Sequence, residues 1–506
     1  MVRGAVTPQP ELSTHATGSD GARWVRYTWF AILIITGFRI LTLAFGKTEL
    51  YLDEEQYWLW GQYPDFGYFS KPPLIGWLIG AVTTLAGSDS PFWVRMPAPL
   101  LQGATAAILA FWARPSLLAG RADAPATAFW IALAYLTLPI ATVGSFVIST
   151  DTVMAPFLAG ALLAYWRMLD APSLSKAVLT GALIGIAMLA KYAGVYFYVF
   201  AAIAAVFQPT MRLAPRYVGV MLITTLIILA PNIYWNATHD FATLDHTAGN
   251  ASWVGGNAVD FDALRFVEFL AGQAIVLGPI FLGVLLVSYA RPWRAEKPAL
   301  IAFSLPVFLV VGVPSFLADV NPNWTFSACL GASALSVIWL RRNGPHWVLI
   351  CALLLNGIAM VAIPLMTLVP ERIVINDKPL LARYIGRSKM AAHMYSAAAE
   401  KNVNAILSAD RSILANLFYH RKNAGDLPVY SVGYSDGNRN YYAQKFPLPD
   451  TVTGPVLYVS RNAPDVQCNA PLVTTFDPAG TYYQGRPAPK AFLLSTECLA
   501  EVTKDD

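Results

Sequence analysis

The residues that decide how this chain is interpreted are Tyr51-Leu-Asp-Glu-Glu-Gln-Tyr-Trp-Leu-Trp60, followed shortly by Gly67-Tyr-Phe-Ser-Lys-Pro-Pro73. The first long apolar run, residues 27–45, ends just before them. Both stretches are therefore expected at a membrane–water boundary. Aromatic residues are ordinary anchors there, but ionised carboxylates near hydrocarbon are costly and are typically kept for function. We interpret this loop as the floor of an active site.

The composition is that of a membrane protein. Of the 506 residues, 56% are hydrophobic and only 13% are charged, against roughly 25% charged in soluble domains. The mean hydropathy is +0.48. A net charge of +4, with basic residues in short loops between apolar runs, indicates membrane orientation and argues against a nucleic-acid partner. The lipid bilayer itself is the expected surroundings of most of the chain.

Apolar runs long enough to cross a bilayer, which takes about 20 residues, recur along the first two thirds of the chain. The short run 73–87 starts with a proline pair and is better suited to an interfacial helix. If it does not span, the basic clusters of the loops all fall on one side, which the positive-inside rule makes cytoplasmic. The candidate runs are 27–46, 73–87, 93–113, 125–144, 151–168, 174–190, 192–208, 217–235, 266–290, 298–317, 324–341 and 346–369.

This sidedness predicts about eleven spanning helices, with the N-terminus inside and the C-terminal region outside. The basic clusters that support this sidedness are Arg23/Arg26, Arg114/Arg121, Arg167/Lys176, Arg212/Arg216, Arg291/Arg294/Lys297 and Arg341/Arg342. Charged residues that are scattered along the chain then converge on one outer cavity.

Three segments are predicted: a disordered tail (1–22), a transmembrane catalytic domain (23–369) and a small α/β domain (370–506). In the last segment, short apolar runs typical of strands alternate with helical patterns. Cys468 and Cys498 could form a disulfide there in an oxidising compartment, or stay free. The expected strands are 403–407, 429–432, 456–459 and 491–494, and the expected helices are 380–399 and 413–419.

The two opening stretches resemble the GT-C superfamily of membrane glycosyltransferases, in particular the bacterial branch related to protein O-mannosyltransferases and lipid A aminoarabinose transferases. The resemblance covers roughly residues 27–370. Further similar motifs are Trp93-Val-Arg95-Met-Pro97, Ser149-Thr-Asp151, Leu189-Ala-Lys191-Tyr-Ala-Gly194, Pro231-Asn-Ile-Tyr-Trp-Asn236 and Asn321-Pro-Asn323-Trp324.

The resemblance implies an inverting transferase that moves a sugar from a polyprenyl-phosphate carrier to an envelope glycan or glycolipid. It implies a bacterial inner membrane with the site and the C-terminal domain facing the periplasm. It also implies that Asp53 is the catalytic base, that Asp151 is a second acid, and that Lys71 contacts the donor phosphate.

One departure concerns metal binding. The aminoarabinose transferases carry an acid before the lysine, whereas this chain has Ser70. A divalent metal therefore stays an open possibility, and no other cofactor is expected. A branch that transfers galacturonic acid to lipopolysaccharide core or lipid A is also similar, and we favour it.

Each candidate residue also has a structural interpretation. Acids such as Asp53, Glu54 and Glu55 commonly open a helix, so Glu54 is a weaker catalytic candidate than Asp53. Asp151 could equally be a helix cap. The basic candidates for the phosphate could instead reach lipid headgroups, and the others could be solvated loop or belt residues. The basic candidates are Lys71, Lys191 and Arg95, and the candidate sugar or acceptor contacts are Tyr57, Tyr68, His246, Asn323 and Trp324.

Two other classes of protein remain open. A transporter or flippase of lipid-linked sugars would also carry charges among its spans, but such proteins often have repeated halves and interrupted helices, which the sequence does not show. A receptor-like or assembly protein would act through its C-terminal domain, and the acid-rich first loop argues against that interpretation.

Overall fold

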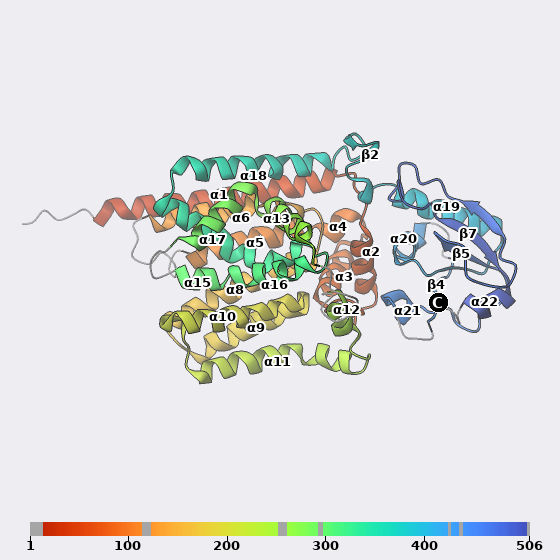
Figure 1. Cartoon of the computed structure of the whole chain (residues 1–506), viewed down its shortest axis with the longest axis horizontal. Coiled ribbons are helices and arrows are strands. Elements are labelled where there is room, and N and C mark those ends of the chain that lie inside the picture. The colour runs from red at the N-terminus through yellow and green to blue at the C-terminus, as the bar shows by residue number, and fades with distance from the viewer. Residues whose placement is uncertain are drawn as a thin grey trace, which may run out of the picture.

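The computed structural model describes residues 14–113, 123–250, 261–291, 297–423, 427–434 and 439–502. A bundle of long helices lies beside a smaller unit that contains a β-sheet (Figure 1). Several of the basic residues used to assign sidedness, Arg114, Arg121 and Arg294, lie outside the described residues. The long bundle helices are α1 (Thr14–Phe45), α5 (Pro97–Trp112), α6 (Ala124–Thr137), α8 (Thr150–Asp170), α9 (Leu174–Ala190), α10 (Tyr196–Phe207), α11 (Pro215–Ala237), α13 (Ala263–Leu277), α17 (Phe326–Asn343) and α18 (His346–Met366).

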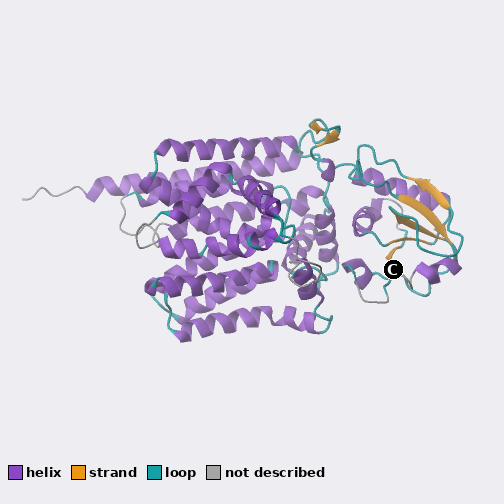
Figure 2. Cartoon of the chain, in the orientation of Figure 1, coloured by secondary structure: helices purple, strands orange, loops and turns teal. Residues whose placement is uncertain are grey.

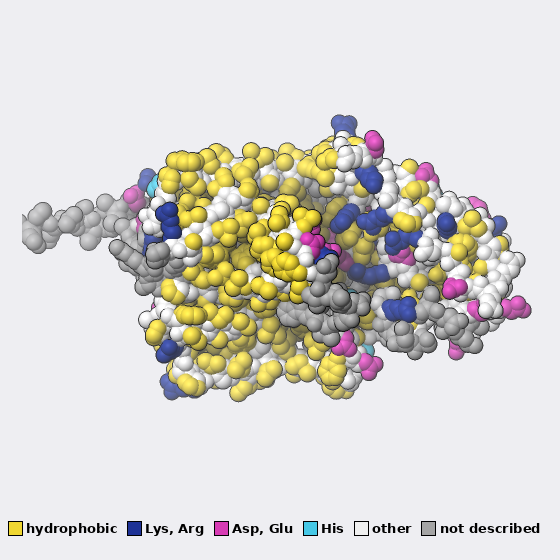
Figure 3. Space-filling view, in the orientation of Figure 1, with side chains coloured by type: hydrophobic (Ala, Val, Ile, Leu, Met, Phe, Trp, Pro, Cys, Tyr) yellow, Lys and Arg dark blue, Asp and Glu magenta, His cyan; other side chains and the backbone are white. Residues whose placement is uncertain are grey.

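Among the described residues, 6 helices are long and apolar enough to cross a membrane, or up to 7 if a bent pair is one span. Shorter apolar helices lie where some of the other spans were expected, at Ala124–Thr137, Leu174–Ala190 and Tyr192–Phe207. On the face shown in Figure 3, the bundle surface is a broad apolar band, with lysine and arginine gathered at the end away from the sheet unit and again on that unit. The chain is thus a multi-pass membrane protein, as the composition predicted.

Several helix boundaries differ from the prediction. Helix α1 begins at Thr14, inside the tail that was expected to be disordered to residue 22. The expected span 266–290 is instead α13 followed by α14 (Pro279–Ala290), bent by 111°. Gly278 at the bend has φ +88°, and a Cβ there would lie 2.0 Å from the Asn356 side chain. A residue with a side chain would therefore strain this turn.

Short helices close the end of the bundle that faces the sheet unit. They are α2 (Leu52–Gln62), α3 (Leu74–Ala86), α4 (Pro91–Arg95) and α12 (Ala242–Asn250) (Figure 1). Helices α2 and α3 approach so closely that a Cβ on Gly61 would lie 2.7 Å from the Gly80 backbone nitrogen. This contact fixes α2, which carries the three acids of the first loop.

Arg39 lies inside α1 and is fully buried. Its guanidinium donates to the Leu136 carbonyl (2.5 Å) and the Thr142 hydroxyl (3.2 Å). It thereby satisfies a carbonyl at the end of α6, just before α7 (Pro139–Val143), as basic side chains often do at helix C-termini.

The small unit is an α/β layer (Figure 2). Its sheet has the order β4-β3-β5-β7-β6, with β3 parallel to β4 and β5, and β7 antiparallel to β5 and β6. The four predicted strands and the helix predicted at 413–419 match the structure, and the helix predicted at 380–399 begins later, at Arg387; β6, α21, α22 and a small hairpin were missed. The elements are β1 (Val374–Ile375), β2 (Lys378–Pro379), α19 (Arg387–Glu400), β3 (Ala405–Ser408), α20 (Arg411–His420), β4 (Val429–Ser431), α21 (Tyr441–Lys445), β5 (Val456–Ser460), β6 (Leu472–Thr475), β7 (Lys490–Leu494) and α22 (Thr496–Val502).

The small unit carries one covalent link. Cys468 and Cys498 form a disulfide, which is one of the two states that the sequence left open. The bond joins the loop before β6 to α22. Disulfides persist in oxidising compartments, which agrees with an outward-facing position for this unit.

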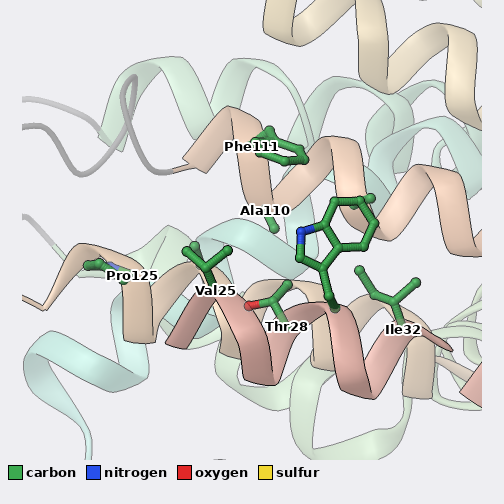
Figure 4. A pocket seen from close by; sticks show the side chains of 9 residues that line it. Val25, Thr28, Ile32, Ala110, Phe111 and Pro125 are labelled. Carbon is green, nitrogen blue, oxygen red and sulfur yellow. The ribbon is translucent and has the colours of Figure 1, made fainter. Parts of the chain in front are cut away.

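A small cavity lies between α1, α5 and α6, at the far end of the bundle from the acidic loop (Figure 4). From Ile32, at its edge, α1 runs on for about 20 Å before the loop begins. The walls contain no ionisable side chain, so this cavity is not a candidate for acid–base chemistry. They are formed by Val25, Thr28, Trp29, Ile32, Ala107, Ala110, Phe111, Pro125 and Ala128.

Candidate active site at the sheet-facing end of the bundle

Glu54 is wholly buried and belongs to an ion pair with Arg95. The two side chains meet through both carboxylate oxygens, at 2.8 and 2.6 Å. Glu54 also accepts from the backbone N–H groups of Tyr51 (3.0 Å) and Ile148 (3.1 Å). It therefore stabilises the start of α2 and ties it to the segment before α8, as the structural interpretation of these acids expects.

The geometry therefore favours structural roles for Glu54 and Arg95 over their predicted roles in catalysis and phosphate binding. The guanidinium of Arg95 is fully occupied, because it also donates to Thr48 (3.0 Å to the hydroxyl) and to the Glu49 carbonyl (2.7 Å). An arginine with all three nitrogens bonded and almost no exposed surface has no donor left for a ligand.

Glu55 makes a second buried ion pair, with Arg387 at the start of α19. Both side chains are completely buried, and the Arg387 Nε donates to the Glu55 carboxylate at 2.8 Å. The Glu49 carboxylate accepts from the backbone N–H of Arg387 and from the Ser388 hydroxyl. These contacts attach the small unit to the first loop.

Asp53 differs from its two neighbours in exposure. Its side chain is 41% exposed, and it pairs with Arg411 at the start of α20. The same guanidinium donates through Nε to Gln56 at 2.6 Å. Since Tyr51, not Asp53, is the N-cap of α2, the carboxylate of Asp53 is not used to begin the helix. Of the three consecutive acids, it alone is accessible to a substrate.

Lys71 lies in the tight loop between α2 and α3, where its carbonyl accepts from Tyr68 N–H (3.2 Å). Among the residues that the structure describes, no acid or carbonyl pairs with its ammonium. Burial, followed by the positive charge of Lys191, lowers its pKa below the usual 10.5. The charges of Asp151, Asp53 and Arg411 also act on it, so residues from five separate segments meet here.

Tyr68 supports this loop, and its position favours that structural role over the predicted contact with the sugar. Its ring is stacked on Trp60, with centroids 4.5 Å apart, and is almost fully buried. Its hydroxyl donates to the Trp60 carbonyl at 2.8 Å and accepts from Asp65 N–H at 3.1 Å. These contacts fix the loop that presents Lys71.

Asp151 lies in the first turn of α8. Ser149, not Asp151, caps that helix by accepting from Thr152 N–H at 3.2 Å. Both oxygens of Asp151 accept from the Lys191 ammonium, at 2.7 and 2.9 Å, and one also accepts from the Asn323 amide at 3.1 Å. This arrangement favours a positioning role for Asp151 over the predicted catalytic role.

Two further predicted contacts, His246 and Tyr57, lie near these groups. His246, on α12, lies 5.4 Å from the Phe69 ring, and burial and the charges of Lys71 and Arg411 lower its pKa to about 4. Tyr57 is buried beside Trp60, and burial together with the charge of Asp53 raises its pKa. Both side chains are thus neutral at pH 7.

Trp324 is the least informative of the predicted contacts. It follows Asn323 in a short 3-10 helix, Pro322–Thr325, and packs partly buried against the bundle core. That position is consistent with the structural interpretation as a belt residue.

The sequence missed the two arginines that the small unit supplies, Arg387 and Arg411. They lie more than 300 residues from the acids that they bind. No local pattern identifies them, because Arg411 looks like an ordinary polar residue before the helix pattern at 413–419. Only the docking of the two parts of the chain reveals their partners.

The residues present do not fit a metal site. Among the described residues, no group of three or more histidine, cysteine, aspartate and glutamate side chains lies where it could hold a metal ion. Ser70, which is buried, contributes no carboxylate beside Lys71. We therefore assign no step to a metal.

Comparisons with known proteins identify the class of protein to which this arrangement belongs. A family profile described as dolichyl-phosphate-mannose-protein mannosyltransferase matches residues 70–235. The chain is 32% identical to the lipid A galacturonosyltransferase RgtD of Rhizobium johnstonii over 478 residues, which cover 93% of this chain and 98% of the relative.

Solved structures of ArnT from Cupriavidus metallidurans have the same fold. The apo form has a TM-score of 0.60 at 13% identity and covers 96% of this chain and 100% of its own. The form bound to undecaprenyl phosphate has a TM-score of 0.60 at 14% identity, with coverage of 93% and 98%. The relative from Rhizobium, which is 32% identical over nearly the whole of both chains, is named as a galacturonosyltransferase, and the matching profile describes mannosyltransferases. The present chain belongs to their superfamily, GT-C, and is a glycosyltransferase.

Proposed function

We propose that this protein transfers one sugar, galacturonic acid, from a polyprenyl-phosphate carrier to lipid A or the lipopolysaccharide core. The relative from Rhizobium is named as a lipid A galacturonosyltransferase, and one ArnT structure holds undecaprenyl phosphate. The charged groups lie at one end of an apolar bundle, and this position supports the proposal. The polyprenyl chain of a lipid-linked donor stays in the bilayer, so its phosphate and sugar are held at the membrane surface.

The observation that carries this proposal is the difference among the three consecutive acids. Glu54 and Glu55 are wholly buried in ion pairs, whereas the Asp53 side chain is 41% exposed. A catalytic base must come within hydrogen-bond reach of the proton that it accepts. Asp53 alone of the three meets that requirement, so we assign it the role of base.

In the proposed reaction an acceptor hydroxyl attacks the anomeric carbon of the donor sugar and passes its proton to Asp53. The bond from that carbon to the carrier's phosphate oxygen breaks, and the phosphate departs with the bonding electrons. The ammonium of Lys71 stabilises the charge that develops on it. A single displacement without a covalent intermediate inverts the anomeric configuration.

We also propose that the site and the small unit face the periplasm, across the bacterial inner membrane. The Lys191–Asp151 pair joins the end of α9 to the start of α8, so Arg167 and Lys176 lie at the opposite end of those helices. Basic residues at that end favour a cytoplasmic location for it. We further propose that 23–369 and 370–506 are the catalytic and periplasmic domains.

This orientation predicts the labelling of single cysteines in a background without Cys351. A membrane-impermeant maleimide added to intact inner-membrane spheroplasts should label Asp319→Cys and Lys422→Cys, which are 94% and 72% exposed at the outer end. It should label Asn343→Cys and Pro172→Cys only after the membrane is permeabilised. Labelling of the second pair in intact spheroplasts would reverse the proposed orientation.

Lys71→Gln is expected to reduce kcat/KM for the donor by about 10- to 100-fold, since a charged hydrogen bond to phosphate is lost. The lowered pKa of Lys71 sets the sign of the pH effect. The wild type should lose donor affinity as pH rises through that pKa, and Lys71→Arg, which stays charged, should retain affinity to higher pH. Steady-state kinetics across pH 7–10.5 measure both effects.

The control for Lys71 is Lys47→Gln, which removes an exposed lysine from the same end of the bundle. This variant should change neither kcat/KM for the donor nor the pH dependence of donor affinity. Equal pH profiles for the wild type and Lys71→Arg would remove Lys71 from the phosphate site.

The experiment that tests the proposed function is mass spectrometry of envelope glycolipids with and without the gene. We expect loss of one hexuronic acid, an increment of about 176 Da for a galacturonyl residue, from lipid A or the core glycan, with recovery on complementation. Unchanged glycolipids in the deletion strain would reject the proposed substrates.

A further inference from the structure

Among the described residues of the small unit, Arg411 is the one whose side chain binds the proposed base directly. It begins α20, and its guanidinium reaches α2, where Nη2 donates to Asp53 and Nε donates to Gln56 at 2.6 Å. The contact therefore joins the small unit to the catalytic carboxylate, and not merely to the surface of the bundle.

The backbone that presents Arg411 is firmly held. Asp410 caps α20 by accepting from the N–H groups of Ser412 (2.8 Å) and Ile413 (3.4 Å), and the guanidinium of Arg461 binds the other oxygen of Asp410 at 2.6 Å. Arg387 adds a bond of 3.2 Å from its buried guanidinium to the Ser412 carbonyl. A side chain on such a support can change its partner while its backbone stays in place.

The guanidinium keeps an unused donor. Within the described part of the chain, no hydrogen bond involves its Nη1, and the side chain is 41% exposed. Lys71 and His246 both lie close enough for the charge of Arg411 to affect their pKa values. Lys191 is paired with Asp151 and Arg411 is paired with Asp53, so exchange of a partner on Arg411 would release the proposed base, whereas exchange on Lys191 would not.

The observed pairing works against catalysis. The Arg411 guanidinium occupies one oxygen of the Asp53 carboxylate, and a base must have its oxygen within hydrogen-bond reach of the proton that it accepts. Asp53 must nevertheless take the acceptor's proton in the proposed reaction. The contact with Arg411 therefore has to weaken when the donor is bound.

We propose that Arg411 is a donor-binding residue whose partner changes during the reaction: an oxyanion of the donor replaces the Asp53 carboxylate on its guanidinium, which frees Asp53 to act as the base. The inference rests on the proposed function. The oxyanion is either the phosphate of the carrier or the carboxylate of the uronic acid, since a guanidinium binds both in the same forked geometry. The exchange is balanced in charge, because Arg411 keeps one anionic partner throughout.

The test compares Arg411→Gln and Arg411→Lys with the wild type in a purified full-length enzyme. Lys422→Gln is the matched control, since it removes another basic residue by which the small unit pairs with the bundle, on Asp89 (3.2 Å). We expect Arg411→Gln to raise KM for the donor about 10- to 100-fold, with transfer still measurable at saturating donor. Arg411→Lys should recover part of the loss, and Lys422→Gln should resemble the wild type.

Two arms distinguish the sources of the oxyanion. If the phosphate is bound, Arg411→Gln should weaken inhibition by undecaprenyl phosphate alone. If the carboxylate is bound, that inhibition should stay unchanged while the preference for a uronosyl over a neutral hexosyl donor falls about 10-fold or more. An Arg411→Gln enzyme that keeps the wild-type KM, the wild-type inhibition and the wild-type preference would overturn the proposal.

The same measurements separate this inference from the proposed function. Absence of product from the wild-type enzyme would reject the proposed function itself. Normal wild-type transfer with Arg411→Gln unchanged would reject only the role of Arg411. If Arg411→Gln acted only by loosening the small unit from the bundle, Lys422→Gln should show the same loss of activity, and both variants should unfold at a lower temperature. That result would also count against a specific role of Arg411 in donor binding.

Discussion

Asp53→Asn is expected to reduce the rate of sugar transfer by about 10²- to 10⁴-fold, the usual contribution of a positioned general base. The amide has nearly the same shape as the carboxylate but cannot accept the hydroxyl proton. Asp53 is partly exposed, so the substitution should leave insertion and folding intact. Transfer is measured as labelled sugar passing from a polyprenyl-phosphate donor to lipid A.

The control is Asp89→Asn, at the same end of the bundle. Asp89 accepts from the Trp58 indole at 2.9 Å and pairs with the exposed Lys422. The amide oxygen retains the first contact, and exposed ion pairs contribute little, so transfer should be near normal. A near-normal rate in Asp53→Asn would withdraw the base assignment.

Glu55→Gln is expected to produce the largest loss of stability, about 3–5 kcal/mol. The substitution leaves the guanidinium of Arg387 buried without its counter-charge. Because this pair joins the first loop to the small unit, the variant should also expose the segment between α18 and α19 to protease. Thermal unfolding in detergent and limited proteolysis measure the two effects.

Its control is Asp20→Asn, which removes an exposed ion pair with Arg23 (2.9 Å). That pair lies on the surface of α1, and its loss should leave the unfolding temperature unchanged. A Glu55→Gln protein as stable as the wild type would mean that the two parts of the chain are held by their other contacts, without help from this ion pair.

The multi-pass class and most elements of the α/β unit follow from the sequence because they depend on local patterns. Apolar runs specify membrane helices, and strands such as β3 and β5 read as short continuous apolar segments. The bend at Gly278 is different, since a continuous apolar run hides a break that depends on the neighbouring Asn356. β6 was missed because its residues are mostly exposed or half-buried.

The site was predicted in part. The sequence identified the loop with Asp53 and Lys71, because acids and a lysine at a membrane boundary are unusual. It could not divide the three acids among their partners, since each pairs with an arginine distant in the chain. That division assigns Glu54 and Arg95 to support, and it brings Arg411 into the site.

The central claim is that the sugar leaves its lipid carrier at this site. The most direct test of this claim mixes the purified protein with lipid A and a polyprenyl-phosphate uronic acid. Mass spectrometry should find one uronic acid gained by lipid A for each polyprenyl phosphate released. A donor that crosses the bilayer of a proteoliposome with its sugar still attached, and no glycosylated lipid A, would contradict the account and favour a flippase.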